Sequence, residues 1–190
     1  MRVISGKKKG MRLYSTRDKF TRPTEDRIKE SIFNVLKDID ENAYVLDLFS
    51  GSGGIGIEFL SRGAKFAVFS DISKINYNCI IDNLEHTDFL ENSKVYIGDY
   101  IRNLNTIKMD SVFKFDYIFI DPPYEKVDFY FEAVDLIKSL ELLNNNGIII
   151  LESEKELNLE KYNLIKTKKY GKKYIYFLDL GEEYENNLSR

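Results

Sequence analysis

Two short segments of the chain carry residues whose types and spacing could support group transfer. Asp121-Pro122-Pro123-Tyr124 follows an apolar run, and the upstream segment 47–56 reads Asp-Leu-Phe-Ser-Gly-Ser-Gly-Gly-Ile-Gly. A glycine-rich loop lets the backbone approach a nucleotide-like ligand closely. An Asp-Pro-Pro-Tyr loop offers oxygen acceptors for an amino group and an aromatic ring for a flat base. Together the two segments indicate transfer of a group onto a planar exocyclic amine.

The Asp-Pro-Pro-Tyr loop suits an amino group attached to an aromatic ring. Such an amine is a weak nucleophile because its lone pair is delocalised, and acceptors on its N–H bonds localise that pair. Asp121 supplies a side-chain oxygen and Pro122 a backbone carbonyl, while the two prolines stiffen the loop. Tyr124 can stack on the base. We therefore expect Asp121, Pro122 and Tyr124 to be catalytic, with either Asp121 or solvent taking the proton.

The glycine-rich segment follows an apolar run and precedes a helical pattern, as in nucleotide-binding loops. Asp71 ends the next apolar run, where a carboxylate can bind a ribose diol. This much fits NAD as well as S-adenosylmethionine. Asp47 favours S-adenosylmethionine, because a carboxylate four residues before the first glycine suits an ammonium group and repels a pyrophosphate. We predict that Asp47, Gly51, Gly53 and Asp71 bind S-adenosylmethionine.

Asp99 is a further candidate for the cofactor site. It follows another apolar run and is expected either to accept from the adenine amino group or to cap the next helix, and the two roles are compatible. Because the sulfonium of the donor already carries positive charge, no metal is needed to activate it.

Apolar runs alternate with helical patterns over most of the chain. Strands are expected at 44–48, 66–70, 94–97, 115–120 and 147–151, and helices at 54–62, 73–86, 100–106 and 128–141. Strands separated by helices at this spacing indicate an α/β fold with a mostly parallel sheet and helices on both faces. The Asn-Asn-Asn-Gly segment 144–147 predicts a turn. Segments 162–169 and 173–180, with no helix between them, predict a terminal antiparallel hairpin.

The first 40 residues differ from this alternation. Segments 3–5 and 11–14 flank a Gly-Lys-Lys-Lys-Gly tip and predict a small β-hairpin. Pro23 then precedes a helix for which Thr24 is the expected N-cap. We expect residues 1–40 to form an N-terminal hairpin and helix extension, in one compact unit with a sheet domain at 41–190.

Composition narrows the classes of function. The chain has 190 residues, 43% hydrophobic and 31% charged, which fits one ordinary soluble domain. Cys79 and His86 are the sole cysteine and histidine, which excludes a Cys/His zinc site, a Ser-His-Asp triad and an internal disulfide. No apolar stretch approaches the roughly 20 residues that span a bilayer, and no signal-peptide core is present. We expect a cytoplasmic monomer without a membrane segment or metal site.

The net charge of −3 hides an uneven distribution of basic residues. The N-terminal part is rich in lysine and arginine, which favours contact with nucleic-acid phosphates. The candidate RNA-binding residues there are Lys7, Lys8, Lys9, Arg12, Arg22 and Arg27. For Arg27, an exposed pair with Glu30 is an equal alternative. A second cluster is made up of Lys166, Lys168, Lys169, Lys172 and Lys173. This cluster is equally compatible with a solvated surface.

The chain resembles the RsmD-type 16S ribosomal RNA guanine-N2 methyltransferases of bacteria over nearly its whole length. The resemblance rests on segments 2–6 with Gly10, 22–30 with Phe33-Asn34, 47–56 with 60–64, 121–124, and 152–154. Segment 22–30 is the most family-specific, whereas Asp-Pro-Pro-Tyr is shared by many amino-methylating enzymes. The chain departs from the family at Asp71, commonly Glu, and at Ser73, often Asp.

The resemblance implies a class I, Rossmann-like S-adenosylmethionine-dependent methyltransferase fold with a mostly parallel seven-stranded sheet. It also implies methyl transfer to the N2 amine of a guanine. The substrate would be 16S ribosomal RNA or an assembling small ribosomal subunit.

Other functions fit parts of the pattern. A DNA adenine-N6 methyltransferase uses the same catalytic loop but usually has an added target-recognition domain, for which this chain has little room. Protein glutamine methyltransferases usually carry Asn in place of Asp121. An NAD(P)-dependent oxidoreductase fits segment 51–56 alone and leaves segment 121–124 unexplained. A catalytically inactive RNA-binding assembly factor would not need the intact motifs.

Overall fold

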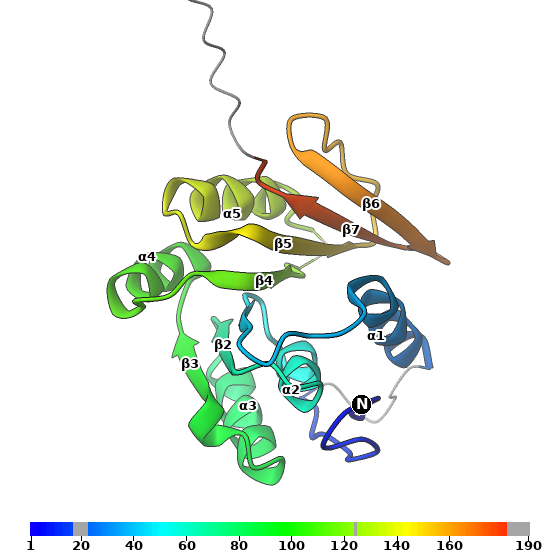
Figure 1. Cartoon of the computed structure of the whole chain (residues 1–190), viewed down its shortest axis with the longest axis vertical. Helices are drawn as coiled ribbons and strands as arrows, with labels where there is room; N and C mark the ends of the chain where they lie inside the picture. The colour runs from blue at the N-terminus through cyan, green and yellow to red at the C-terminus, as the bar shows by residue number, and fades with distance from the viewer. Residues whose placement is uncertain (17–22, 124, 182–190) are drawn as a thin grey trace, which may run out of the picture.

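The strands of the computed structural model join in one seven-stranded sheet (Figure 1). They are β1 (Tyr44–Asp47), β2 (Phe66–Asp71), β3 (Ser93–Ile97), β4 (Phe115–Ile120), β5 (Leu143–Ser153), β6 (Asn163–Tyr170) and β7 (Lys173–Asp179). Their order is β3-β2-β1-β4-β5-β7-β6, with parallel pairing from β3 to β5 and antiparallel pairing of β7 with both β5 and β6. The predicted mostly parallel sheet with a terminal antiparallel hairpin is confirmed. The structure describes residues 1–16, 23–123 and 125–181, with backbone only for 23–25.

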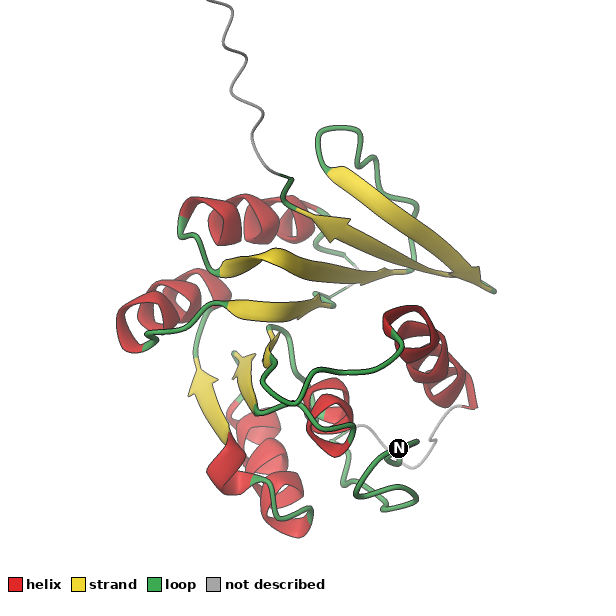
Figure 2. Cartoon of the chain, viewed as in Figure 1, coloured by secondary structure: helices red, strands yellow, loops and turns green. Residues whose placement is uncertain are grey.

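Helices cover both faces of the sheet (Figure 2). They are α1 (Pro23–Leu36), α2 (Gly54–Ser61), α3 (Lys74–His86), α4 (Tyr100–Asp110) and α5 (Asp128–Ser139), with a 3-10 turn at Leu90–Asn92. Side chains alternate along each strand, so neighbouring residues enter different cores. Ile118 packs with residues of α4 and α5, whereas Phe119 packs with residues of α1, α2 and α3. In the described part of the chain, no helix is long and apolar enough to cross a membrane.

Two predicted boundaries are wrong. Helix α1 begins at Pro23, so Thr24 lies inside its first turn instead of capping it. Proline is favoured at a first helical position because its missing N–H would have no partner there. The predicted turn 144–147 is part of β5, opposite a register shift between Phe115 and Tyr117. The Asn144 amide donates to the Asp116 carboxylate at 2.7 Å, so the asparagine supports strand pairing.

The N-terminal hairpin forms without regular strands at 3–5 and 11–14. Its arms are joined by the Arg2–Arg12 bridge and by the bond from the Val3 N–H to the Met11 carbonyl at 2.9 Å. The N–H groups of Ile4 and Ser5 turn away from the other arm and donate to the Glu58 carboxylate at 2.8 and 3.0 Å. A regular ladder is therefore replaced by attachment to α2.

Glu58 connects the N-terminal extension to the sheet domain. Its fully buried carboxylate also accepts from Arg62 at 2.9 Å and lies 3.5 Å from the ammonium of Lys29 in α1. A Cβ atom on Gly6 would lie 1.8 Å from the Ser61 carbonyl oxygen, so the hairpin backbone rests directly on the end of α2. Residues 1–8, α1 and α2 therefore form a single packed assembly.

Candidate functional site

The loops that follow β1 and β4 lie side by side at one edge of the sheet. β1 and β4 are parallel neighbours with Asp47 opposite Phe119, so the two strands end at nearly the same level. The sheet continues to β2 and β3 on one side of β1 and to β4 and β5 on the other. In open α/β sheets, ligands bind at such a reversal of strand order, outside the carboxyl ends of the strands. The two predicted motifs thus meet at the expected edge, although the sequence separates them widely.

The glycine-rich loop leaves space in front of its first glycine. Gly51 and Gly53 have φ angles of 56° and 80°, in the left-handed region that favours glycine. A Cβ atom on Gly51 would meet no atom within 4 Å, so this backbone faces open space. A Cβ atom on Gly56 would lie 2.3 Å from the Phe69 ring. Gly51 therefore faces space that a ligand can approach. Gly53, where an added Cβ would lie 3.3 Å from the Phe69 ring, and Gly56 instead permit close packing against the core.

Asp71 orients this loop from the end of β2. Its carboxylate accepts from the Gly51 N–H at 2.9 Å, the Ser73 N–H at 2.8 Å and the Asn76 amide at 3.1 Å. Ser73 caps α3 by accepting from the Asn76 N–H at 3.3 Å. A carboxylate has about four lone-pair positions, so one remains for a ligand hydroxyl after these three bonds.

Asp47 lies beneath the glycine-rich loop and is 2% exposed. Its carboxylate accepts from the Gly56 N–H at 3.0 Å. Burial raises the pKa of Asp47 to about 7; the bond from Gly56 opposes this shift, and the nearby Asp71 carboxylate adds to it. A charged carboxylate at this depth is costly without a positive partner. The position therefore suits a ligand that brings a cation.

Asp99 caps α4, as one of its two predicted roles required. Its carboxylate accepts from the Ile101 N–H at 2.9 Å, and the side chain is exposed. Two isoleucines near these acids are also exposed: Ile72 by 73% and Ile101 by 46%. Exposed apolar side chains beside acids suit a flat ring with polar edges. Ile72 directly follows Asp71, a signal that was available in the sequence and was not used.

The Asp-Pro-Pro loop, for which a catalytic role is predicted, begins where β4 ends. Asp121 is half-buried and Pro122 is buried, and the loop turns through a bond from the Lys126 N–H to the Pro123 carbonyl at 2.8 Å. Tyr124 lies outside the described residues. The described part of the loop therefore has a defined path from the sheet edge to α5.

An aromatic cluster includes Phe49 of the glycine-rich segment. Phe49 from the glycine-rich segment lies 5.3 Å from Tyr100 and 6.4 Å from Phe129, measured between ring centres, and the last two rings are 5.0 Å apart. Tyr100 begins α4 and Phe129 lies in the first turn of α5, so their meeting with Phe49 was not apparent from the sequence. The three rings form an apolar surface next to the glycine-rich segment.

Buried amides and hydroxyls hold the strand ends together. The Ser70 N–H donates to the Ser50 hydroxyl at 2.9 Å, and the Asn103 amide donates to the Ser70 hydroxyl at 2.9 Å. The amide of Asn83 donates to the Ser52 carbonyl at 2.9 Å and the Tyr14 carbonyl at 3.0 Å. Sequence reasoning missed these residues, because isolated Ser and Asn carry no pattern.

The predicted RNA-binding residues divide into two groups. Residues 1–8 run along α2, with Met1 against Gly54 at its start and the Lys7 N–H bonded to the Ser61 carbonyl at its end. The tip, which includes Lys7, Lys8 and Lys9, is therefore at the far end of α2 from the glycine-rich loop. Lys8 is also paired with Asp88 at 2.7 Å.

Arg12 and Arg27 are exposed near the other end of the hairpin. Arg12 bridges to Arg2, whose guanidinium pairs with Asp26 at 2.9 Å, next to Arg27. Arg22 lies outside the described residues. The structure thus brings Arg12 and Arg27 into one region and leaves the lysine tip elsewhere.

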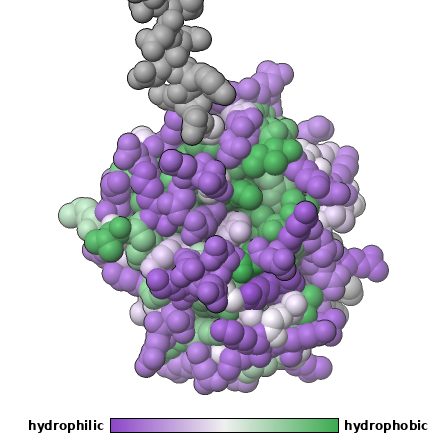
Figure 3. Space-filling view, in the orientation of Figure 1, coloured by the Kyte–Doolittle hydropathy of each residue, from purple (hydrophilic) through white to green (hydrophobic). Residues whose placement is uncertain are grey.

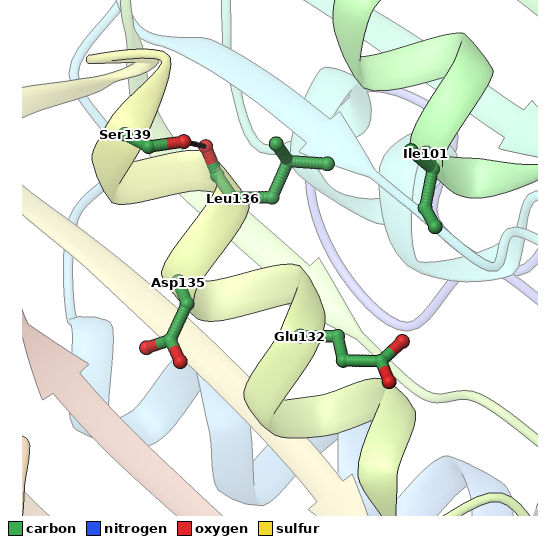
Figure 4. Close-up of a pocket in the computed structure, with 5 residues that line it drawn as sticks. All are labelled: Ile101, Glu132, Asp135, Leu136 and Ser139. Carbon is green, nitrogen blue, oxygen red and sulfur yellow. Dashed lines mark hydrogen bonds between the residues drawn. The ribbon is translucent and has the colours of Figure 1, made fainter.

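Two shallow depressions are lined by residues outside these two loops. One is lined by Tyr14, Asp82, Glu85 and His86, and the other by Ile101, Glu132, Asp135, Leu136 and Ser139 (Figure 4). In the second, the Ser139 hydroxyl donates to the Leu136 carbonyl at 2.9 Å, and Asp135 pairs with Lys161 at 2.8 Å. Neither depression includes a residue of the glycine-rich or catalytic loop, and acidic side chains in both disfavour phosphate.

A family model described as conserved hypothetical protein 95 matches residues 1–179. The chain belongs to this family. Among its relatives, YlbH of Bacillus subtilis is 38% identical over 176 residues, covering 90% of this chain and 94% of that protein. The ribosomal RNA small subunit methyltransferase D of Haemophilus influenzae is 32% identical over 175 residues, covering 90% and 89%. The predicted RsmD-type family is confirmed.

Solved structures support the same fold for the family. The structure of yhhF from Escherichia coli, described there as a methyltransferase, has a TM-score of 0.80 at 27% identity, covering 94% of this chain and 96% of that one. The methyltransferase SMU.776, solved with SAH, has a TM-score of 0.63 at 14% identity and shows the shared fold. The structural match covers 82% of this chain and 49% of SMU.776. The predicted class I methyltransferase fold is confirmed.

Proposed function

We propose that the chain transfers the methyl group of S-adenosylmethionine to the N2 amine of a guanine in 16S ribosomal RNA. The observation that carries this proposal is the meeting of the glycine-rich loop and the Asp-Pro-Pro loop at the reversal of strand order between β1 and β4. One loop suits the donor and the other suits the amine. The relative named as a ribosomal RNA small subunit methyltransferase supports the substrate class.

The residues at the first loop fit the donor. Open space in front of Gly51 admits its methionine part, and the buried carboxylate of Asp47 suits its ammonium group. Asp71 keeps one acceptor position for a ribose hydroxyl, and Asp99 with Ile72 offers an acid and an apolar surface to adenine. S-Adenosylmethionine supplies an electrophilic methyl group on a sulfonium.

Asp121 and Pro122 orient the amine for attack. The Asp121 carboxylate and the Pro122 carbonyl accept hydrogen bonds from the two N–H groups of the amine. These bonds direct the nitrogen lone pair at the methyl carbon. The nitrogen forms the new C–N bond while the C–S bond breaks, and a proton then leaves the nitrogen to Asp121 or to solvent. The buried ring of Pro122 and the Lys126–Pro123 bond keep the acceptors in position. Tyr124 stacks on the base in this proposal.

The target guanine must leave its stack to reach this loop. We propose that Arg12 and Arg27 hold phosphates near the site and that Arg22 also contacts the RNA. Lys7, Lys8 and Lys9 would contact RNA farther away, because α2 has 8 residues and is about 12 Å long. An extended substrate such as a subunit particle can reach both groups.

The test is transfer of radiolabelled methyl from S-adenosylmethionine to small ribosomal subunits, free 16S RNA and duplex DNA, followed by nucleoside analysis. Label in N2-methylguanosine from the RNA or the particle supports the proposal. Label in N6-methyladenine of DNA would transfer the same loop chemistry to a DNA enzyme and overturn the substrate assignment. Label in no nucleic acid, with SAH binding intact, would overturn it as well.

A further inference from the structure

We propose a second RNA-contact surface, the hairpin strip, formed by Lys166, Lys168 and Lys172 of the β6–β7 hairpin together with Arg27 of α1. It would bind phosphates that flank the target nucleotide, and it rests on the proposed function. The lysines belong to the cluster for which sequence reasoning left a solvated surface equally open. Four features of the structure favour phosphate contact.

The first feature is the level of the hairpin in the sheet. Ile120 of β4 pairs with Leu151, Leu151 with Tyr176, and Tyr176 with Thr167 of β6. Asp121, which directly follows β4, and Lys168 of β6 are the next residues along these two parallel strands, so they lie at the same level. The strands are about 4.8 Å apart, which puts Lys168 about 14 Å from Asp121 across the sheet. The turn that carries Lys172 extends beyond this level, on the edge that bears the catalytic loop.

The second feature is the face on which the lysines lie. Lys166 pairs with Phe177 and Lys168 with Ile175, and both partners belong to the core under α1, α2 and α3. Residues directly opposite each other on neighbouring strands share a face. Lys166 and Lys168 therefore lie on the side of α1. Tyr170, two residues farther on, lies there too, because its hydroxyl contacts the Ser31 hydroxyl of α1.

The third feature is the position of Arg27. It precedes Ser31 by four residues, so the two side chains are neighbours on one side of α1. The Ser31 hydroxyl of α1 contacts the Tyr170 hydroxyl of the β6–β7 hairpin. Arg27 is exposed, and no ion pair with Glu30 is found among the described residues. Its guanidinium therefore lies along the same junction as the lysines.

The fourth feature is the availability of these charges. Within the described residues, Lys166, Lys168 and Lys172 make no ion pair, whereas Lys173 pairs with Glu152 and Lys169 bonds to the Tyr174 hydroxyl at 2.7 Å. The sequence contains no acid between Lys161 and Asp179. Unpaired cations that continue toward a catalytic edge match a polyanion, and RNA is the polyanion that the proposed reaction requires.

Protection of the exposed edge strand is the alternative reading, since lysines on edge strands discourage pairing with another chain. Leu164 and Ile165 of β6 are 44% and 52% exposed, and Figure 3 shows hydrophobic surface over this hairpin at the upper right. Edge protection accounts for Lys166 beside Ile165. It does not account for Lys168 and Lys172, which lie beyond the apolar part of the strand.

The test compares two triple variants of equal charge. The strip variant is Lys166→Gln with Lys168→Gln and Lys172→Gln. The control variant is Lys65→Gln with Lys108→Gln and Lys114→Gln. Lys65 directly precedes β2 and Lys114 directly precedes β4, at the end of the parallel strands opposite to the Asp-Pro-Pro loop. The probe is whichever RNA or particle the parent methylates, with affinity measured against salt concentration. The slope of log affinity against log salt should fall by about 0.7 for each phosphate that the strip variant no longer binds, and stay unchanged in the control.

Three further readouts separate the possible failures. SAH affinity should equal that of the parent in both variants, and the matching Lys→Arg strip variant should restore the parent slope. If the strip variant keeps the parent's salt dependence of RNA affinity, whether or not it also self-associates, the hairpin strip does not contact RNA. That result would leave the proposed methylation activity unaffected. A parent that methylates no RNA overturns the proposed function itself.

Discussion

The carboxylate of Asp47 accepts a hydrogen bond from the backbone N–H of Gly56 at 3.0 Å. Asp47 ends β1 and Gly56 lies in the first turn of α2, so this bond fixes the helix to the strand across the glycine-rich loop. Burial raises the pKa of Asp47 to about 7. The charge of Asp47 therefore changes near neutral pH, where the chain is expected to bind its cofactor.

Binding of SAH should weaken as the pH falls below about 7. Protonated Asp47 is neutral and does not attract the ammonium group of the ligand. Ionised Asp47 is negatively charged and attracts it. Calorimetric titration between about pH 5.5 and 8.5 should show tighter binding at higher pH, with proton release near neutrality. Asp47→Asn should bind more weakly than the parent above about pH 7, approach the parent at about pH 5.5, and show a flatter profile. An unchanged profile in this variant would mean that another group titrates.

The ligand-free chain should lose stability through Asp47 as the pH rises. The pKa is raised from its ordinary value of 3.8 to about 7, so the folded chain holds this proton more tightly than the unfolded chain. The contribution is fully favourable below about pH 4 and is lost as the pH approaches 7. Urea denaturation of the parent and of Asp47→Asn should show a smaller decline for the variant across that interval. An equal decline in the free energy of unfolding for both proteins would show that Asp47 does not cause this pH dependence.

Asp121→Ala should slow methyl transfer about 100- to 1000-fold and leave SAH affinity within about twofold. Loss of one preorganised hydrogen-bonding group in an active site costs about 100- to 1000-fold in rate. Single-turnover methylation and calorimetry measure the two properties separately. Asp128→Ala, an exposed acid at the start of α5, is the matched control and should retain activity. Loss of SAH binding in Asp121→Ala would show that the loop belongs to the donor site.

Glu58→Gln should strongly destabilise the fold. The change removes the negative charge that lies beside both the Lys29 ammonium, which is 3% exposed, and the Arg62 guanidinium. Breaking a buried ion pair by removing one partner costs about 3–5 kcal/mol. The urea midpoint should fall sharply, and the N-terminal amides should exchange faster with solvent. Asp110→Asn, which removes the exposed pair with Lys94, should leave the midpoint almost unchanged.

Gly6→Ala should detach the N-terminal hairpin from α2, whereas Gly10→Ala should not. Both glycines have φ angles above 80°, so alanine costs about 1–2 kcal/mol of backbone strain at either position. Only at Gly6 would the added Cβ meet another atom, the Ser61 carbonyl oxygen at 1.8 Å. Limited proteolysis should therefore cut the Gly6 variant earlier. Equal protection of the two variants would contradict the docking of the hairpin on α2.

The sequence determined the elements and the chemistry of the loops. Hydrophobic periodicity gives the alternation of strands and helices, and glycine and proline at strand ends restrict the backbone wherever they occur. Asp47, Asp71 and Asp121 could be selected because each follows an apolar run, and strand ends are where α/β folds bind ligands. The turn expected at 144–147 failed because pairing with β4 outweighed the local preference of asparagine and glycine.

Only the tertiary structure decided which of these residues meet. Strand order brings the loops after β1 and β4 together, and it is set by burial of both sheet faces, which no local pattern encodes. The same packing moved Lys7, Lys8 and Lys9 to the far end of α2, since buried Glu58 holds the hairpin along that helix. It also brought Lys168 level with Asp121. Charge and residue type are local properties of a chain, whereas proximity results from the packing of its elements.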